Sequence, residues 1–126
     1  MNLFKWETFK AHSGEMLDWK INCDALTDED IKCLAKIITL KIEYKQALGI
    51  PRGGIKLALE LKKYRTPVSD VTLIVDDVLT TGNSMERIRE KLIIHNYKNI
   101  KGVVIFSRSK CPDWITPIFQ LWNGIK

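Results

Sequence analysis

The sequence lacks any long apolar run. No stretch approaches the ~18 residues that a membrane-spanning helix needs, and the first residues lack the apolar core of a secretory signal peptide. Cysteine is scarce: Cys23, Cys33 and Cys111 are odd in number and widely spaced, which fits neither a disulfide framework nor a metal cluster. We therefore expect the cysteines to be small buried apolar residues in a reducing compartment, and the protein to be cytoplasmic and not attached to a membrane.

The sequence also lacks a P-loop motif and any sign of a repetitive or multi-domain organisation. No Gly-x-x-x-x-Gly-Lys pattern is present, which excludes a nucleotide-binding P-loop, and there is no internal repeat, linker or low-complexity segment. A length of 126 residues suits one hydrophobic core, so we expect one domain over residues 1–126. Lys and Arg outnumber Asp and Glu by 20 to 15. Because the basic residues are scattered, small anionic ligands are favoured over nucleic acid as partners.

The chain is organised around residues 73–85, an apolar run followed by two acids and a hydroxyl-rich turn. Leu73–Val75 is continuously apolar, which predicts a strand that is buried on both faces and ends at Val75. Asp76 and Asp77 follow at the strand end, where open α/β sheets bind ligands. Adjacent carboxylates there can accept hydrogen bonds from sugar hydroxyls or hold a divalent cation.

The turn after these acids supplies backbone N–H groups, hydroxyls and a helix N-terminus, which together form an anion site. Its residues are Thr80, Thr81, Gly82, Asn83 and Ser84. Carboxylates for a ribose beside a turn for a phosphate predict a pocket for a 5-phosphosugar. A plain capped turn of an α/β protein is the alternative. A phosphate-accepting receiver domain is another, but it would not need the hydroxyl-rich turn.

Residues 73–85 resemble the phosphoribosyl-pyrophosphate signature of type I phosphoribosyltransferases, in which an apolar strand, two acids and two apolar residues precede Thr-Thr-Gly-x-Ser. The resemblance implies that phosphoribosyl pyrophosphate and Mg²⁺ bind here and that a nitrogenous base accepts the phosphoribosyl group. Asp76 and Asp77 would then be metal ligands and, with Thr80, catalytic residues. Purine-using relatives commonly carry an acid where Thr80 stands, so a pyrimidine or orotate-like acceptor is implied rather than a 6-oxopurine.

A second turn, Pro51, Arg52, Gly53 and Gly54, follows the short apolar segment 47–50. Its glycines let the backbone approach a ligand closely, and the Arg52 guanidinium suits phosphate oxygens. Taken alone, the turn is equally typical of an ordinary strand-to-helix connection. The resemblance implies that it is the pyrophosphate-binding loop, with a cis peptide bond between Pro51 and Arg52.

The remaining pattern alternates between strand and helix. Apolar spacing predicts a helix that Thr27 caps and that ends near residues 43–45, and further helices over residues 55–63 and from residue 85 to 95. Residues 102–106 predict another buried strand, whereas two prolines exclude a helix in the segment after it. This alternation predicts an α/β fold with a mainly parallel sheet and helices on both faces.

Candidates for base binding come from two regions. His12 precedes Ser-Gly in a turn that resembles the start of orotate phosphoribosyltransferases, although that family has lysine at this place. Arg108 and Trp114 follow the strand after which the family binds its base. A structural turn residue is the alternative for His12, and ordinary core packing is the alternative for Trp114.

Between Leu61 and Asp70 the chain is too short for the additional strand and long mobile loop that the family usually has. Such a loop covers the reacting centre and excludes water. Two hypotheses therefore remain open: a phosphoribosyltransferase, and a non-catalytic module that senses phosphoribosyl pyrophosphate or a nucleotide. A homodimer, in which a second subunit covers the site, is a further expectation.

Overall fold

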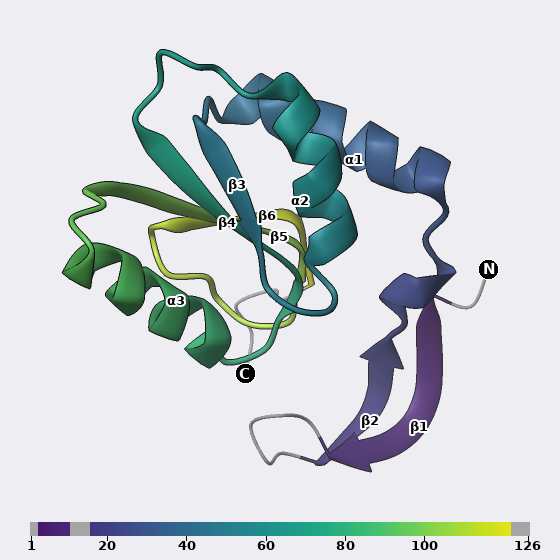
Figure 1. Ribbon diagram of the computed structural model, residues 1–126. Helices are drawn as coiled ribbons and strands as arrows, with labels where there is room; N and C mark the ends of the chain where they lie inside the picture. The colour runs from purple at the N-terminus through teal and green to yellow at the C-terminus, as the bar shows by residue number, and fades with distance from the viewer. Residues whose placement is uncertain (1–2, 11–15, 122–126) are drawn as a thin grey trace.

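The computed structural model describes residues 3–10 and 16–121. Within these ranges an antiparallel hairpin precedes a larger sheet that carries the helices (Figure 1). The hairpin consists of β1 (Phe4–Lys10) and β2 (Met16–Ile21) and extends away from the larger sheet. The turn that contains His12 lies outside the described residues.

The larger sheet has four strands in the order β3-β4-β5-β6, and all of its neighbouring strands are parallel. They are β3 (Gln46–Gly49), β4 (Val71–Leu79), β5 (Asn99–Ser107) and β6 (Ile115–Gln120). Strands of this kind have both faces covered, which agrees with the unbroken apolar run of β4. The expected parallel α/β architecture is confirmed.

Helices cover both faces of this sheet, as the alternation of strand and helix predicts (Figure 1). They are α1 (Asp28–Lys41), α2 (Ile55–Leu61) and α3 (Asn83–Ile94). Side chains of β4 alternate between the two faces: Leu73 and Val75 pack with α1 and α2, and Ile74 packs with Met85 of α3. None of the helices in the described ranges is both long and apolar enough to cross a bilayer.

Helix α1 begins with a complete capping box. The Asp30 N–H donates to Thr27 Oγ1 at 3.1 Å, and the Thr27 N–H donates to Asp30 Oδ2 at 2.8 Å. The helix ends at Lys41, earlier than the expected residues 43–45, because Tyr44 turns into the core and the Lys45 N–H donates to the Val71 carbonyl, where the sheet begins.

One sequence-based expectation needs correction. Cys33 is exposed, not buried, because it lies beside the apolar stripe of α1. All three cysteines are free thiols, and Cys23 and Cys111 are half-buried. Strand β6 is not apparent from the sequence, since Pro117 lies within it. Proline is tolerated there because β6 is an edge strand, paired on one side by β5.

The connection from α2 to β4 is short. A single 3₁₀ turn, Lys62–Tyr64, follows α2, and the chain then passes through residues 65–70 into β4. The Tyr44 hydroxyl lies in the core and donates to the Leu61 carbonyl at 2.5 Å, which fixes the end of α2. The connection therefore holds neither an additional strand nor a long loop.

Candidate functional site

Asp76 and Asp77 lie in β4 just beyond the point where its neighbour β3 ends, while its other neighbour, β5, continues. Strand β3 ends with Gly49 opposite Val75, whereas β4 continues to Leu79 beside β5. The strand is thus longer than the run ending at Val75 that the sequence predicts. Because β3 has already ended, Asp76 and Asp77 face the loop that follows it, at the carboxyl edge of the sheet.

Both aspartates are half-buried and interact with each other. The Asp77 N–H donates to Asp76 Oδ1 and the Val78 N–H donates to Asp77 Oδ1, each at 2.8 Å. Burial, followed by the hydrogen bond to Asp77 and its charge, raises the pKa of Asp76 to about 8. A site of this kind gains from a bound cation or from hydroxyl donors, since either one stabilises the second negative charge.

The hydroxyl-rich turn is held in shape by glycine and by a contact from a distant loop. Gly82 has φ of 82°, in the left-handed region that side chains disfavour, and it directly precedes α3. The first bond of the helix runs from the Glu86 N–H to the Gly82 carbonyl at 2.9 Å. Ser109 Oγ donates to the Thr80 carbonyl at 2.8 Å and so ties the loop after β5 to this turn.

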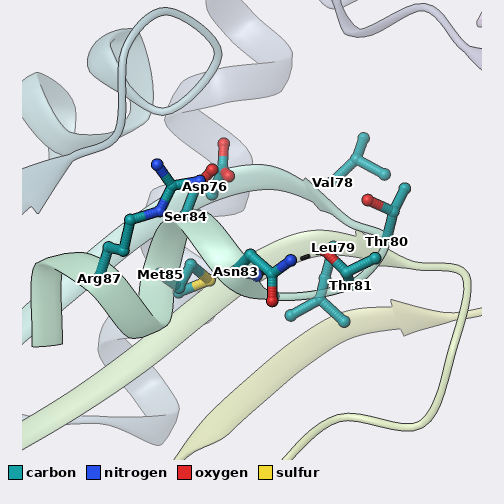
Figure 2. A pocket seen from close by; sticks show the side chains of 10 residues that line it. Asp76, Val78, Leu79, Thr80, Thr81, Asn83, Ser84, Met85 and Arg87 are labelled. Atoms are coloured by element: carbon teal, nitrogen blue, oxygen red, sulfur yellow. Dashed lines mark hydrogen bonds between the residues drawn. The ribbon is translucent and has the colours of Figure 1, made fainter. Parts of the chain in front are cut away.

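A first cavity of about 100 Å³ lies over this turn (Figure 2). It brings together Asp76 and all five residues that the sequence assigns to the phosphosugar. The helix N-terminus opens onto it, and the first N–H groups of a helix have no partner within the helix. The Asn83 N–H donates a hydrogen bond to Thr81 Oγ1 at 3.4 Å. The backbone N–H groups of the next residues in the first turn of α3 can therefore donate to a bound anion.

Arg87 also lines this cavity and was missed by the sequence analysis. Its side chain extends from α3 over the same space as Ser84 and Asp76 (Figure 2). The sequence signal is the position of Arg87 three residues after Ser84, which places the two on the same face of a helix. It was overlooked because Arg87 also fits the charged, solvated face of that helix. A guanidinium beside an anion-binding turn suits a phosphate group.

A second cavity, of about 450 Å³, lies on the other side of the acidic pair. Its polar lining comes from three elements: the segment after β2, the loop after β3 with the first turn of α2, and β4. These residues are Asn22, Asp24, Arg52, Lys56 and Asp77. Asp76 lines the first cavity and Asp77 the second, so the pair divides two spaces that together suit an elongated ligand.

The loop after β3 fits closely against the acidic pair. A Cβ on Gly54 would overlap the Val75 carbonyl oxygen, which is backbone, so position 54 needs glycine. A Cβ on Gly53 would overlap the Asp77 carboxylate, so position 53 needs glycine as long as Asp77 keeps its place. The Ile50 N–H donates to the same Val75 carbonyl at 2.8 Å. The peptide bond between Pro51 and Arg52 is cis, as the resemblance implies.

Cys23 also lines the second cavity. Burial, followed by the charge of Asp77 and a hydrogen bond to it, raises the pKa of the Cys23 thiol to about 12. The thiol is therefore neutral near pH 7 and packs against the core as a small apolar group.

Of the base-binding candidates, Arg108 and Trp114 line neither of these two cavities, and His12 lies outside the described residues. Trp114 packs beside α3, where its Nε1 donates to Glu86 Oε2 at 3.1 Å and the Arg89 guanidinium lies 5.1 Å from its ring. This is the core-packing alternative. The Arg108 N–H donates to the Leu79 carbonyl at 3.1 Å, next to the signature turn. The roles of Arg108, Trp114 and His12 in binding a base stay predictions.

The donor set at the acidic pair fits a magnesium ion that is shared with a ligand. Among the residues that the structure describes, no three or more His, Cys, Asp or Glu side chains form a cluster able to hold a metal ion. Mg²⁺ commonly takes one or two carboxylates and completes its shell with phosphate oxygens and water. Asp76 and Asp77 would supply the carboxylates, and a phosphorylated ligand the remaining oxygens.

Comparison with solved structures identifies the fold as that of the type I phosphoribosyltransferases. Orotate phosphoribosyltransferase from Aeropyrum pernix is 17% identical with a TM-score of 0.74, covering 94% of this chain and 89% of its own. The orotate phosphoribosyltransferase from Francisella tularensis is 19% identical with a TM-score of 0.63, covering 94% of this chain and 80% of its own.

A purine enzyme also matches, less closely. Hypoxanthine-guanine phosphoribosyltransferase from Bacillus anthracis is 11% identical with a TM-score of 0.54, covering 76% of this chain and 80% of its own. No protein-family model and no curated protein matches the sequence. The chain thus has a type I phosphoribosyltransferase-like fold, with orotate phosphoribosyltransferases among its structural neighbours.

Proposed function

We propose that the protein binds phosphoribosyl pyrophosphate with Mg²⁺ and transfers the phosphoribosyl group to a nitrogenous base. The observation that carries this proposal is the division of two cavities by Asp76 and Asp77, one with an anion-binding turn and the other with two cationic side chains. The 5-phosphate would lie in the first cavity, the ribose hydroxyls at the acidic pair, and the pyrophosphate in the second.

In the reaction, a base nitrogen uses its lone pair to form a bond to the anomeric carbon. The bond from that carbon to pyrophosphate breaks, the electron pair leaves with the pyrophosphate oxygen, and a proton on the attacking nitrogen passes to solvent. The transition state resembles an oxocarbenium ion, as in other displacements at an anomeric carbon. The protein contributes by fixing the sugar and by placing carboxylates near the positive charge that develops on it.

Binding would be divided among the parts already described. The turn from Thr80 to Ser84 and Arg87 would hold the 5-phosphate, with donors fixed before the ligand arrives. Asp76 and Asp77 would accept hydrogen bonds from the ribose and hold Mg²⁺, whose chemistry is to neutralise phosphate charge. Thr80, in place of an acid, favours a pyrimidine or orotate-like acceptor over a 6-oxopurine.

A non-catalytic sensor of phosphoribosyl pyrophosphate or a nucleotide is the second candidate. The specific observation in its favour is the short connection over residues 62–70, which holds no segment able to close over the ligand. An open site admits water, which weakens electrostatic contacts and lets the activated sugar hydrolyse. A second subunit that covers the site in a homodimer would remove this obstacle.

Turnover distinguishes the two candidates. Pyrophosphate release is measured with phosphoribosyl pyrophosphate, Mg²⁺ and each of orotate, uracil and hypoxanthine, over a dilution series that also reports molecular mass. Release that depends on a pyrimidine base is the expected result for the transferase. Thermal stabilisation by phosphoribosyl pyrophosphate without release for any base would support the sensor instead.

A further inference from the structure

The second cavity contains a lysine that belongs to no recognised motif of the sequence. Lys56 lies in the first turn of α2 and lines this cavity together with Arg52, Gly53 and Asp77. Arg52 and Lys56 are the only cationic side chains among the described residues that line it. The same lining contains the carboxylates of Asp24 and Asp77, so the two cations supply the positive charge that phosphate oxygens would need in this cavity.

The packing of the loop explains why a cation is placed at residue 56 and not within the turn itself. A Cβ on Gly53 would overlap the Asp77 carboxylate, so position 53 cannot carry a side chain while Asp77 keeps its place. Lys56 is the second residue of α2 and lines the same cavity. A cation therefore reaches the cavity from the helix that follows the turn.

The ammonium group of Lys56 is available for a ligand. In the structure it lies 3.9 Å from Asp28 Oδ1, and the two side chains are 76% and 85% exposed. An exposed pair at this distance contributes little, so exchanging the carboxylate for phosphate oxygens is easy. Lys63, by comparison, is held by Glu60 at 3.0 Å and does not line this cavity.

We propose that Lys56, together with Arg52, binds the pyrophosphate group of the substrate and stabilises it as it leaves. This inference rests on the proposed function and names a binding residue for it. When the bond to the anomeric carbon breaks, negative charge accumulates on the departing pyrophosphate oxygen. Cations beside that oxygen stabilise the transition state more than the bound substrate, because the negative charge on the oxygen is larger there.

The test compares three variants with the wild-type protein: Lys56→Ala, Lys56→Arg and Lys32→Ala. Lys32 is a matched control, because it lies on α1 with its own partner, Glu29, does not line the second cavity, and its removal changes the net charge by the same amount. Affinities for pyrophosphate and for ribose 5-phosphate are measured by calorimetry in the presence of Mg²⁺. For an active protein, kcat and KM are measured in parallel.

We expect Lys56→Ala to weaken pyrophosphate binding about tenfold, equivalent to about 1.4 kcal/mol, and to leave ribose 5-phosphate binding unchanged. Lys56→Arg should restore most of the affinity, and Lys32→Ala should match the wild type. Equal losses for both ligands, or no loss in Lys56→Ala, would overturn the inference and leave the proposed function intact. A wild-type protein that binds neither ligand would contradict the proposed function itself, and this inference with it.

Discussion

Replacing each glycine of the loop after β3 by alanine separates its role in binding from its role in folding. A Cβ on Gly53 would overlap the Asp77 carboxylate, which can move away by rotating its side chain. That rotation gives up the hydrogen bond from the Val78 N–H, which measures 2.8 Å. A hydrogen bond to a charged group contributes about 1.5–3 kcal/mol, so Gly53→Ala should lower the free energy of unfolding by about that amount.

Gly54→Ala meets backbone instead of a side chain. Its Cβ would overlap the Val75 carbonyl oxygen and lie 2.9 Å from the Ile50 nitrogen, two groups that are joined by a 2.8 Å hydrogen bond. Neither can move without separating the loop from β4. Overpacking costs about 1–3 kcal/mol, and an unsatisfied buried polar group costs a further ~1–3 kcal/mol. Gly54→Ala should therefore lower the free energy of unfolding by about 2–6 kcal/mol.

Urea denaturation measures the two losses of stability, and calorimetry measures the affinity for phosphoribosyl pyrophosphate with Mg²⁺. Gly53→Ala should stay folded and bind at least tenfold more weakly, about 1.4 kcal/mol, because Asp77 has been displaced from the ligand. Wild-type affinity in Gly53→Ala would refute the assignment of Asp77 to the site. Wild-type stability in Gly54→Ala would refute the packing argument.

Three further changes test other parts of the structure. Arg87→Gln should weaken binding of ribose 5-phosphate about tenfold or more by calorimetry, since a charge-assisted hydrogen bond contributes ~1.5–3 kcal/mol; unchanged affinity would remove Arg87 from the site. Thr27→Ala breaks the capping box with Asp30 and should lower the free energy of unfolding by about 1 kcal/mol in urea. Tyr44→Phe loses the hydrogen bond to the Leu61 carbonyl, again about 1 kcal/mol. Burial raises the pKa of Tyr44 from 10.0 to about 12, so between these pH values the folded state keeps a proton that the unfolded chain releases. The free energy of unfolding of the wild type should therefore fall as pH rises from 10 to 12, and that of Tyr44→Phe should fall less.

The sequence predicts the central strand and the signature turn well because local and tertiary preferences agree there. The run Leu73–Val75 has no polar residue to expose, so a strand covered on both faces is its only favourable place. The turn from Thr80 to Ser84 needs a left-handed residue, and Gly82 supplies it. The capping box of Thr27 and Asp30 is a purely local pattern, and it forms completely.

Features that depend on the neighbouring strands are not predictable in the same way. The extension of β4 beyond Asp76 is set by pairing with β5, and the exposure of the acids to the loop is set by the end of β3 at Gly49. Strand β6 includes Pro117, which argues against a strand unless the strand is known to lie at an edge.

Two cationic side chains, Arg87 and Lys56, are the other part that the sequence does not reveal, although it does single out Arg52. Arg87 and Lys56 lie on helices among other charged residues, and a helical pattern assigns such residues to a solvated face. Only the arrangement of α2 and α3 around the carboxyl edge of the sheet places them over the two cavities. Arg87 can be found by its position three residues after Ser84 in α3, whereas no local pattern identifies Lys56.

The proposed function depends on binding of phosphoribosyl pyrophosphate to the acidic pair. Its most direct test is a calorimetric titration of phosphoribosyl pyrophosphate with Mg²⁺ into the wild-type protein and the Asp76→Asn, Asp77→Asn double variant. We expect saturable binding of one ligand per chain in the wild type and at least a hundredfold weaker binding, about 2.7 kcal/mol, in a double variant that remains folded. Absence of binding in the wild type, or equal affinity in the double variant, would contradict the claim.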